Sequence, residues 1–411
     1  MAPSILEEPD RVLSKRPRFS ALTRFGLVAG LALALTACAP GPQKPPQPNT
    51  NAPIARYDTV RMQDLPGWDE DRVVEALPAF LSSCARLAGK ADNAPIGPAP
   101  LGMTVGDYKV TCDALSALIR EAGPNPPSFL VRSALEGLFT PVAVKALEDG
   151  SRDGRFTGYY EAELFAARQP DALHQVPIYG VPEDLVMKGS TGLRDLGQGR
   201  TAPYFTRAEI DDGALAGRAP VLFWAQDAVD LHVLQIQGSG VVTLPDGSRT
   251  RIGYAANNGH KFVGIGGLML KRGLGEGGDM RSIRRWLKAN PDQAWGLMRE
   301  NPRYIFFQEN TGPGPIGAQG VALTSGRSLA VDTRAIPLGS LLWVDVSWPG
   351  RAPLRQLMVA QDVGAAIKGA VRGDVFFGTG ERALDLAGGF NNPGRYYLFV
   401  PRYAGFLFPS S

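Results

Sequence analysis

The stretches 329–346, LAVDTRAIPLGSLLWVDV, and 356–380, QLMVAQDVGAAIKGAVRGDVFFGTG, decide the fold of this chain. Their short runs of Val, Ile, Leu and Phe are separated by glycine-rich turns, a pattern that predicts buried β-strands. Asp332, Asp362 and Asp374 each follow or interrupt one of these runs. A carboxylate at the end of a buried strand costs free energy unless it is paired, hydrogen-bonded or protonated. A carboxylic acid held protonated in apolar surroundings is the group that breaks a glycosidic bond.

The N-terminal region has the features of a secretory signal over residues 1–37. A basic lead precedes the apolar run 25–37, FGLVAGLALALTA, which is short for a membrane span. The run leads into Leu-Thr-Ala-Cys38, which resembles the lipobox of bacterial lipoproteins. This resemblance implies cleavage before Cys38, lipidation of Cys38 and, because Ala39 stands where an inner-membrane protein usually has Asp, an outer membrane lipoprotein facing the periplasm. An ordinary cleaved signal with a coincidental cysteine is the alternative.

The composition favours a mainly β protein whose ligand is largely neutral. The Pro-rich segment 38–53 predicts an extended tether, which the lipobox resemblance implies is lipidated at Cys38, and the remainder is long enough for two domains. The formal net charge is +3, and residues 1–37 carry five basic and three acidic side chains, so the rest is close to neutral. This balance and the lack of a basic stripe give no indication of nucleic acid binding.

The cysteines and histidines give little support to metal chemistry. Beyond Cys38, Cys84 and Cys112 form an even pair in an oxidising compartment. They predict either a disulfide or two buried thiols, and the sequence favours the thiols. The three histidines lack metal-ligand spacing, so we expect neither a metal nor another cofactor.

The order of the elements suggests one domain interrupted by another. Helical patterns and strand patterns alternate in blocks along the chain. We expect helices at about 69–90, 105–121, 130–147 and 268–272, a helix capped by Asp279, and another that starts at 290–291 and stops before Pro302. We also expect short strands over 156–254 that include LHVLQIQGSG at 231–240, a hairpin turn at 245–247, a Gly-rich mobile loop at 188–202, and strands from 304 onward. Thr206 to Glu209 has the spacing of a capping box for a short helix within the β block. Residues 54–155 and 255–411 would form one body with helices, and residues 156–254 an inserted β domain.

Several ordered motifs in the second half carry a family resemblance. The chain resembles the membrane-bound lytic murein transglycosylase A family, whose 3D domain is named for three aspartates. The matching pieces are FTGYYEAEL at 156–164, LQIQGSG at 234–240, GYAANNGHKFVGIGG at 253–267, NPRYIFFQE at 301–309, and the segments around Asp332, Asp362 and Asp374. The segment AVRGD at 370–374 is slightly longer and more basic than the family pattern.

The resemblance implies a fold and a reaction. The fold is a double-psi β-barrel domain interrupted by a second β-barrel domain, with a groove between them. The substrate is peptidoglycan glycan strands, cleaved at the MurNAc-β-1,4-GlcNAc bond without water to leave 1,6-anhydroMurNAc ends. The expected partners are these strands, the outer membrane through the lipid anchor, and a cell-wall synthesis complex.

The resemblance also assigns roles to single residues. Asp374 would be the catalytic acid/base, Asp362 a supporting group close to the chemistry, and Asp332 a structural group, for which its own sequence context already suggests an Asx turn. Substrate binding carries over to Gln237, Thr157, Tyr160 and Lys368. We expect strand alternation to put Gln235 and Gln237 on one face, and one of Tyr159 and Tyr160 in the groove.

Two rival functions remain open. A hydrolytic glycosidase would pair Asp374 with Asp362 or Glu161, because hydrolysis needs a second carboxylate. A non-catalytic cell-wall-binding lipoprotein would bind the polysaccharide without cutting it. Flanking apolar side chains at Val371, Val375 and Phe376 favour the enzyme, since they would raise the pKa of Asp374.

Overall fold

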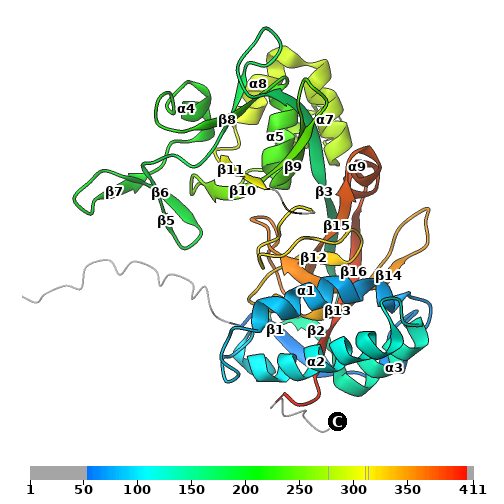
Figure 1. Cartoon of the computed structure of the whole chain (residues 1–411). Coiled ribbons are helices and arrows are strands. Elements are labelled where there is room, and N and C mark those ends of the chain that lie inside the picture. Colours follow the sequence, from blue (N-terminus) through cyan, green and yellow to red (C-terminus); the bar gives the residue numbers. More distant parts are fainter. Residues whose placement is uncertain (1–52, 276, 311, 313, 405–411) are drawn as a thin grey trace, which may run out of the picture. The chain divides into compact units, whose positions relative to one another are not determined.

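The computed structural model describes residues 53–404 except residues 276, 311 and 313, and Figure 1 shows its helices and strands. The signal at 1–37, Cys38 and all of the tether but its last residue lie outside these described residues. Within the described part, no helix is both long enough and apolar enough to cross a bilayer. The same part contains no cluster of His, Cys, Asp and Glu suited to a metal ion.

Most strands belong to one sheet of 13 strands. Its hydrogen-bonded order is β1-β2-β16-β13-β14-β12-β15-β3-β9-β10-β11. In addition, β8 pairs with β3, and β4 pairs with β8. Because β16 also pairs with β3, the strands β16, β13, β14, β12, β15 and β3 close into a ring. The bounds are β1 Ala55–Thr59, β2 Phe139–Ala146, β3 Gly154–Ala167, β4 Val176–Tyr179, β8 Val221–Ala225, β9 Ser239–Thr243, β10 Arg249–Asn257, β11 Ile305–Asn310, β12 Ser328–Val331, β13 Leu341–Val346, β14 Leu354–Asp362, β15 Arg372–Thr379 and β16 Asn391–Pro401.

Strand β3 connects the two parts of this sheet (Figure 1). Its first half pairs with β15 and β16 inside the ring, and its second half pairs with β9 and β8. Side chains alternate along a strand. The even positions Phe156, Tyr160 and Leu164 lie in hydrophobic cores, so the odd positions from Thr157 to Glu163 share the opposite face.

The first helices pack on β14, β16 and β2, and those expected at 69–90 and 130–147 are shorter than the sequence predicts. They are α1 (Leu77–Leu87), α2 (Val105–Ala122) and α3 (Ser128–Leu138). The helix expected at 130–147 is wrong in its second half, which is β2 between β1 and β16. Pro141 explains the change, because proline lacks an N–H and clashes in a helix interior, and the surrounding Val residues favour a strand.

The stretch predicted as a strand around LHVLQIQ is a helix, α5 (Ala228–Gln237). Asp227 caps it, because its Oδ1 accepts hydrogen bonds from the Val229 N–H at 2.7 Å and the Asp230 N–H at 3.1 Å. Gly238 ends it in the left-handed region, with φ of 85°. The prediction that alternation aligns Gln235 with Gln237 is therefore wrong.

A small separate sheet replaces the mobile loop expected at 188–202. It is a three-stranded antiparallel meander. Its strands are β5 (Leu185–Lys188), β6 (Thr191–Asp195) and β7 (Thr201–Pro203). Gly-rich turns in this stretch separate short strands, which the composition alone did not reveal.

The remaining helices follow the capping signals of the sequence. Thr206 and Glu209 form the capping box of α4 (Arg207–Asp211), and Asp279 caps α7 (Met280–Ala289). The other two after α5 are α6 (Ile265–Arg272) and α8 (Pro291–Arg299), and α9 (Glu381–Gly388) follows β15. The turn at 245–247 joins β9 to β10 as predicted.

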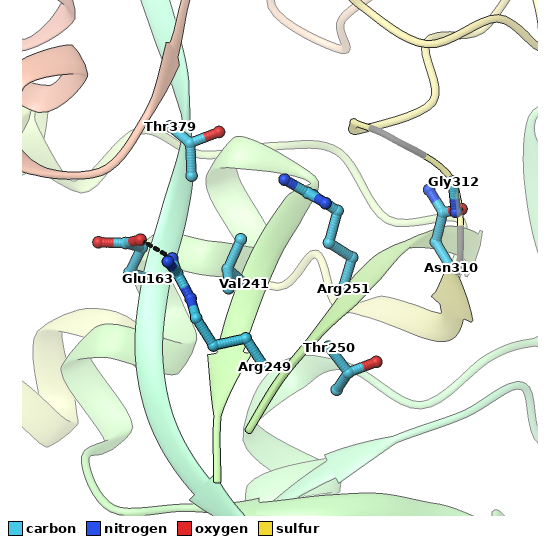
Figure 2. Close-up of a pocket in the computed structure, with 8 residues that line it drawn as sticks. All are labelled: Glu163, Val241, Arg249, Thr250, Arg251, Asn310, Gly312 and Thr379. Atoms are coloured by element: carbon cyan, nitrogen blue, oxygen red, sulfur yellow. Dashed lines mark hydrogen bonds and ion pairs between the residues drawn. The ribbon is translucent and has the colours of Figure 1, made fainter. Parts of the chain in front are cut away.

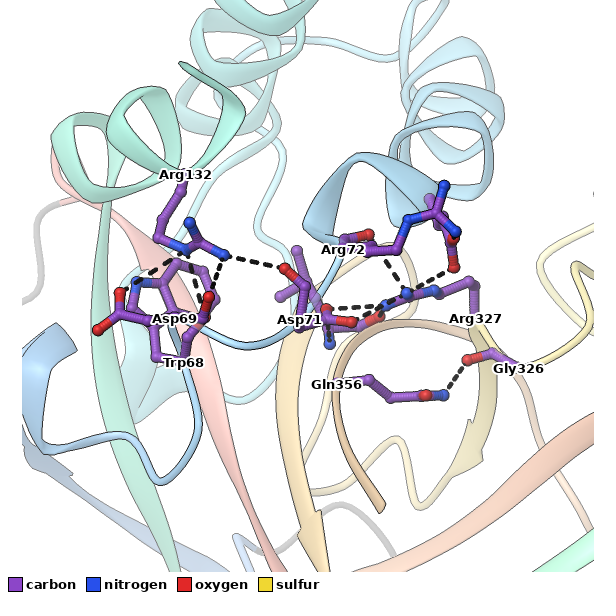
Figure 3. Close-up of polar contacts among 10 residues, drawn as sticks. Trp68, Asp69, Asp71, Arg72, Arg132, Gly326, Arg327 and Gln356 are labelled. Carbon is purple, nitrogen blue, oxygen red and sulfur yellow. Dashed lines mark hydrogen bonds and ion pairs between the residues drawn. The ribbon is translucent and has the colours of Figure 1, made fainter. Parts of the chain in front are cut away.

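Two connections hold the N-terminal segment, one within it and one to the ring. Cys84 and Cys112 form a disulfide between α1 and α2, which corrects the preference for two buried thiols. Arg327, whose side chain is buried, donates to Asp71 from both terminal nitrogens, at 2.9 and 3.0 Å (Figure 3). It also donates to the Leu357 carbonyl at 3.0 Å. Asp71 in turn accepts the Leu357 N–H at 3.0 Å. This ion pair holds the loop before α1 against β14, the strand that ends in Asp362.

Candidate active site

Asp362 and Asp374 lie on two strands that flank β12. Ala330 of β12 is in register with Asp362 of β14 on one side and with Asp374 of β15 on the other. Since neighbouring strands are about 4.8 Å apart, the two aspartate Cα atoms are separated by roughly 10 Å. The ring therefore brings both predicted catalytic-site aspartates to one region.

Asp374 is held by a chain of hydrogen bonds from two side chains. The Thr157 hydroxyl lies 2.5 Å from Asp374 Oδ1 and donates to it. Arg372 Nη2 donates to the same Thr157 Oγ1 at 2.7 Å. An arginine can only donate, so Thr157 accepts from Arg372 and directs its single hydrogen to Asp374. This arrangement leaves Oδ2 of Asp374 as the oxygen that can carry a proton.

The surroundings of Asp374 raise its pKa to about 6. Burial is the largest cause, since it disfavours the charged form, and the nearby Asp362 carboxylate adds to it. The positive charge of Arg372 and the hydrogen bond from Thr157 act in the opposite direction but are outweighed. Asp374 can therefore be protonated in mildly acidic solution, unlike an ordinary aspartate.

Asp362 is partly buried and accepts hydrogen bonds from three donors. Tyr159 donates from its hydroxyl to Oδ2 at 2.9 Å, and the backbone N–H groups of Ala318 and Val363 donate to Oδ1, each at 2.9 Å. Burial nevertheless raises the pKa of Asp362, while these hydrogen bonds lower it. Tyr159 and Thr157 thus hold Asp362 and Asp374 separately, from the same face of β3.

Asp332, for which the sequence predicts a structural role, is held by hydrogen bonds from neighbouring loop residues. Its carboxylate accepts from the Arg334 side chain at 2.6 Å, from the Arg334 N–H at 3.1 Å and from the Gly369 N–H at 2.9 Å. Burial raises the pKa of Asp332, but the hydrogen bonds from Arg334 and Gly369 outweigh it and lower the pKa overall. The expected Asx turn is present, and Asp332 ties down the loop that leads into β15.

The two adjacent tyrosines of β3 face opposite ways. Tyr160 packs in a hydrophobic core and is only 5% exposed, whereas Tyr159 reaches Asp362. The sequence assigned Tyr160 to the substrate and left Tyr159 unassigned. Counting alternate positions from Thr157 selects Tyr159, and that signal was present in the sequence.

The remaining expected substrate contacts lie at the edges of this region. Gln237 is the last residue of α5, and its Oε1 accepts the Tyr160 N–H at 3.1 Å, so it connects α5 to β3. Gln235 is buried and bonded to Arg207. Lys368 is exposed in the loop between β14 and β15. Sequence analysis missed Arg372, although its position two residues before Asp374 and the basic character of that segment were visible.

Comparison with known proteins identifies the family. The family described as the MltA specific insert domain matches residues 155–308, and the 3D domain matches residues 327–400. The membrane-bound lytic murein transglycosylase A of Vibrio cholerae is 31% identical over 264 residues, which is 61% of this chain and 67% of that protein. The crystal structure of a membrane-bound lytic murein transglycosylase from Agrobacterium tumefaciens is 32% identical and has a TM-score of 0.75, with 86% of this chain and 99% of that chain covered.

The chain belongs to the membrane-bound lytic murein transglycosylase A family. This family is one of enzymes, and its insert domain and 3D domain together contain both aspartates of the site and the side chains that bond them, Thr157, Tyr159 and Arg372. A further relative, the Escherichia coli MltA structure with bound chitohexaose, is 25% identical with a TM-score of 0.62, and 86% of this chain and 97% of that chain are covered. The membrane-bound lytic murein transglycosylase A fold, with an inserted domain, is thus the fold of this chain.

Proposed function

We propose that this chain is a peptidoglycan lytic transglycosylase that cleaves the MurNAc-β-1,4-GlcNAc bond without water and leaves 1,6-anhydroMurNAc ends. The observation that carries the proposal is Asp374, one acid with a pKa raised to about 6 and with one oxygen fixed by Thr157. The family membership supports the same reaction. The relative with bound chitohexaose, an oligosaccharide, supports a glycan as the ligand.

One acid is sufficient for this reaction. Protonated Asp374 gives its proton to the departing GlcNAc O4 as the C1–O4 bond breaks. The C6 hydroxyl of the same MurNAc then forms the C1–O6 bond, and Asp374, now a carboxylate, takes the hydroxyl proton. No water is consumed, and Asp374 ends the cycle protonated. The internal nucleophile is held close to its target, which contributes several kcal/mol in typical intramolecular reactions.

The hydrogen bonds around Asp374 suit both halves of the cycle. With Oδ1 accepting from Thr157, we assign the transferred proton to Oδ2. After the first step the charged carboxylate retains the Thr157 hydrogen bond and the nearby Arg372 charge, and both favour the ionised form. Arg372 and Thr157 are therefore positioning residues for an acid that must change its protonation state twice.

A hydrolytic mechanism with Glu161 as the second carboxylate has little support. The Glu161 side chain has no exposed surface, and it accepts from Arg251 Nε at 3.1 Å and from the Thr379 hydroxyl at 2.6 Å. A general base must reach the attacking water, and Glu161 is occupied and covered. Asp362 is likewise committed to three donors.

The architecture and location follow as parts of this proposal. We propose that the six-stranded ring has the double-psi topology. We also propose that the inserted part extends to about Asn310, because β11 pairs with β10 and α7 packs on α5. We further propose that Cys38 is lipidated and that residues 38–53 tether the enzyme to the outer membrane, facing the periplasm. The names of the relatives as membrane-bound proteins support this location. Association with a cell-wall synthesis complex is compatible with it.

The variant Asp374→Asn tests the proposal against a pure binding role. An enzyme should keep its affinity for sacculi and lose product formation by about a hundred- to ten-thousand-fold, since asparagine cannot transfer the proton. A binding lipoprotein would show no product with either protein. Sacculus pull-down and product chromatography on both proteins distinguish the two roles.

A further inference from the structure

A cavity of about 580 Å³ opens where β3, β9, β10 and β15 meet the start of the loop after β11 (Figure 2). Its lining is mostly polar and includes two arginines on one face of β10. The lining residues are Glu163, Val241, Arg249, Thr250, Arg251, Asn310, Gly312 and Thr379. No role in the reaction described above falls to any of them.

The ion pair at this cavity is asymmetric. Glu161 is completely buried behind the wall, and both of its oxygens contact Arg251 Nε, at 3.1 and 3.4 Å. The Arg251 side chain is 31% exposed, and Figure 2 shows its guanidinium pointing into the cavity. Among the described residues, none bonds the two terminal nitrogens of Arg251. A buried carboxylate therefore orients a guanidinium whose free edge, with four N–H donors, faces the opening.

A second pair forms the rim of the same cavity. Arg249 Nη2 is bonded to Glu163 Oε1, and both side chains are substantially exposed. The rim thus presents a positive and a negative group side by side, while the one further charged group among the described lining residues is the guanidinium of Arg251. A planar, bidentate donor of this kind matches a carboxylate.

The cavity lies along the strand that carries the catalytic contacts. Thr157, Tyr159, Glu161 and Glu163 are alternate residues of β3, and they contact Asp374, Asp362, Arg251 and Arg249 in that order. From Thr157 to Glu161 the strand advances about 13 Å. A glycan strand bound at Asp374 could therefore present one of its side groups to Arg251.

We propose that this cavity binds the carboxylates of the stem peptide of peptidoglycan, with Arg251 as the main contact. The proposal rests on the proposed function, because it makes the cavity part of substrate recognition. The sugars themselves are largely neutral, whereas the stem peptide carries free carboxylates. Arg251 would then be a specificity residue that makes the enzyme prefer peptide-bearing glycan to naked glycan.

The first test compares two substrates with three proteins. The two substrates are intact sacculi and sacculi stripped of peptide by an amidase. Each is digested by the wild type, by Arg251→Gln and by the control Arg272→Gln. The control removes an exposed arginine of α6 that pairs with Glu300. We expect Arg251→Gln to lose about tenfold in kcat/KM on intact sacculi and to match the wild type on stripped sacculi. Arg272→Gln should match the wild type on both. Equal losses on the two substrates, or no loss on either, overturn the proposal, and activity on stripped sacculi shows that the variant is folded.

A binding experiment separates this proposal from the catalytic one. Purified stem tetrapeptide is titrated calorimetrically into the wild type, Asp374→Asn and Arg251→Gln. The first two should bind equally, and Arg251→Gln about tenfold more weakly. A tetrapeptide with its carboxylates converted to amides should bind all three as weakly as the variant. Equal binding of the tetrapeptide by all three proteins refutes the cavity assignment, even if transglycosylation occurs. Weaker binding by Arg251→Gln alone supports the assignment, even if no anhydro product is ever found.

Discussion

Arg372 Nη2 lies 2.7 Å from Thr157 Oγ1, and this contact determines how Thr157 acts on Asp374. The guanidinium occupies the acceptor side of the hydroxyl, so the hydroxyl hydrogen is directed to Asp374 Oδ1. The arrangement couples a positively charged group to the acid without a direct salt bridge. Burial raises the pKa of Asp374 to about 6, while Arg372 and Thr157 act against that rise. At this pKa an acid can both give and take a proton near neutral pH.

Removal of the Thr157 hydroxyl should slow the enzyme. Thr157→Val keeps the shape of the side chain but removes the donor, so we expect kcat to fall about 10- to 100-fold, the usual effect of losing a hydrogen bond to a charged group. Thr157→Ser retains the donor and should stay within a few-fold of the wild type. Steady-state rates of anhydro-product release measure both. Equal rates for Val and wild type would rule out the positioning role.

Replacement of Arg372 should change the pH profile. The Arg372 charge lowers the pKa of Asp374, so Arg372→Gln should raise it above about 6. The alkaline limb of the rate profile, where Asp374 loses its proton, should then move to higher pH, while the maximal rate falls because Thr157 is less well oriented. Arg372→Lys keeps the charge and should leave the limb in place. A limb that moves to lower pH in the Gln variant contradicts this account.

Asp374→Asn should be more stable than the wild type at neutral pH. The native pKa of about 6 exceeds the unfolded value of about 3.9, so the native state binds more protons between these two values. Wild-type stability therefore falls as pH rises through this window. The neutral amide avoids this loss, and its advantage should grow from near zero at pH 4 to the order of 2 kcal/mol above pH 6. Urea unfolding at pH 4, 5, 6 and 7 measures it, and an advantage that is constant across this range would be inconsistent with the assigned pKa.

Reduction of the Cys84–Cys112 disulfide should destabilise the N-terminal helices. The two cysteines are 28 residues apart, and closing a loop of this length typically contributes about 3 kcal/mol. Dithiothreitol should lower the melting temperature of the wild type. The double variant Cys84→Ser with Cys112→Ser should melt at the temperature of the reduced wild type, whether or not dithiothreitol is present. An unchanged melting temperature after full reduction would show that the bridge contributes little.

The sequence predicted the three aspartates because they interrupt apolar runs in a way that few buried strands tolerate. It also predicted the helix caps at Thr206 and Asp279, since capping is a local property. The error at α5 arose because alternating Val, Leu and Ile in LHVLQIQ resemble a strand, and the Asp227 cap was overlooked. The error after α3 arose because the predicted helix ran through Pro141, although proline breaks a helix.

The contacts around the acid could not be predicted from local pattern. Thr157 and Asp374 are 217 residues apart, and their pairing depends on the register between β3 and β15. Glu161 and Arg251 likewise meet only because β3 and β10 lie on either side of β9. Side-chain alternation along β3 would have placed Thr157, Tyr159 and Glu161 on one face, but not opposite their partners.

The most direct test of the central claim is the mass of the muropeptides that the wild-type enzyme releases from sacculi. A single acid that recruits the C6 hydroxyl predicts fragments ending in 1,6-anhydroMurNAc, lighter by one water than ordinary reducing fragments. Their yield should vanish in Asp374→Asn and fall as pH rises through about 6. Fragments ending in reducing MurNAc, with solvent oxygen incorporated from labelled water, would contradict the mechanism.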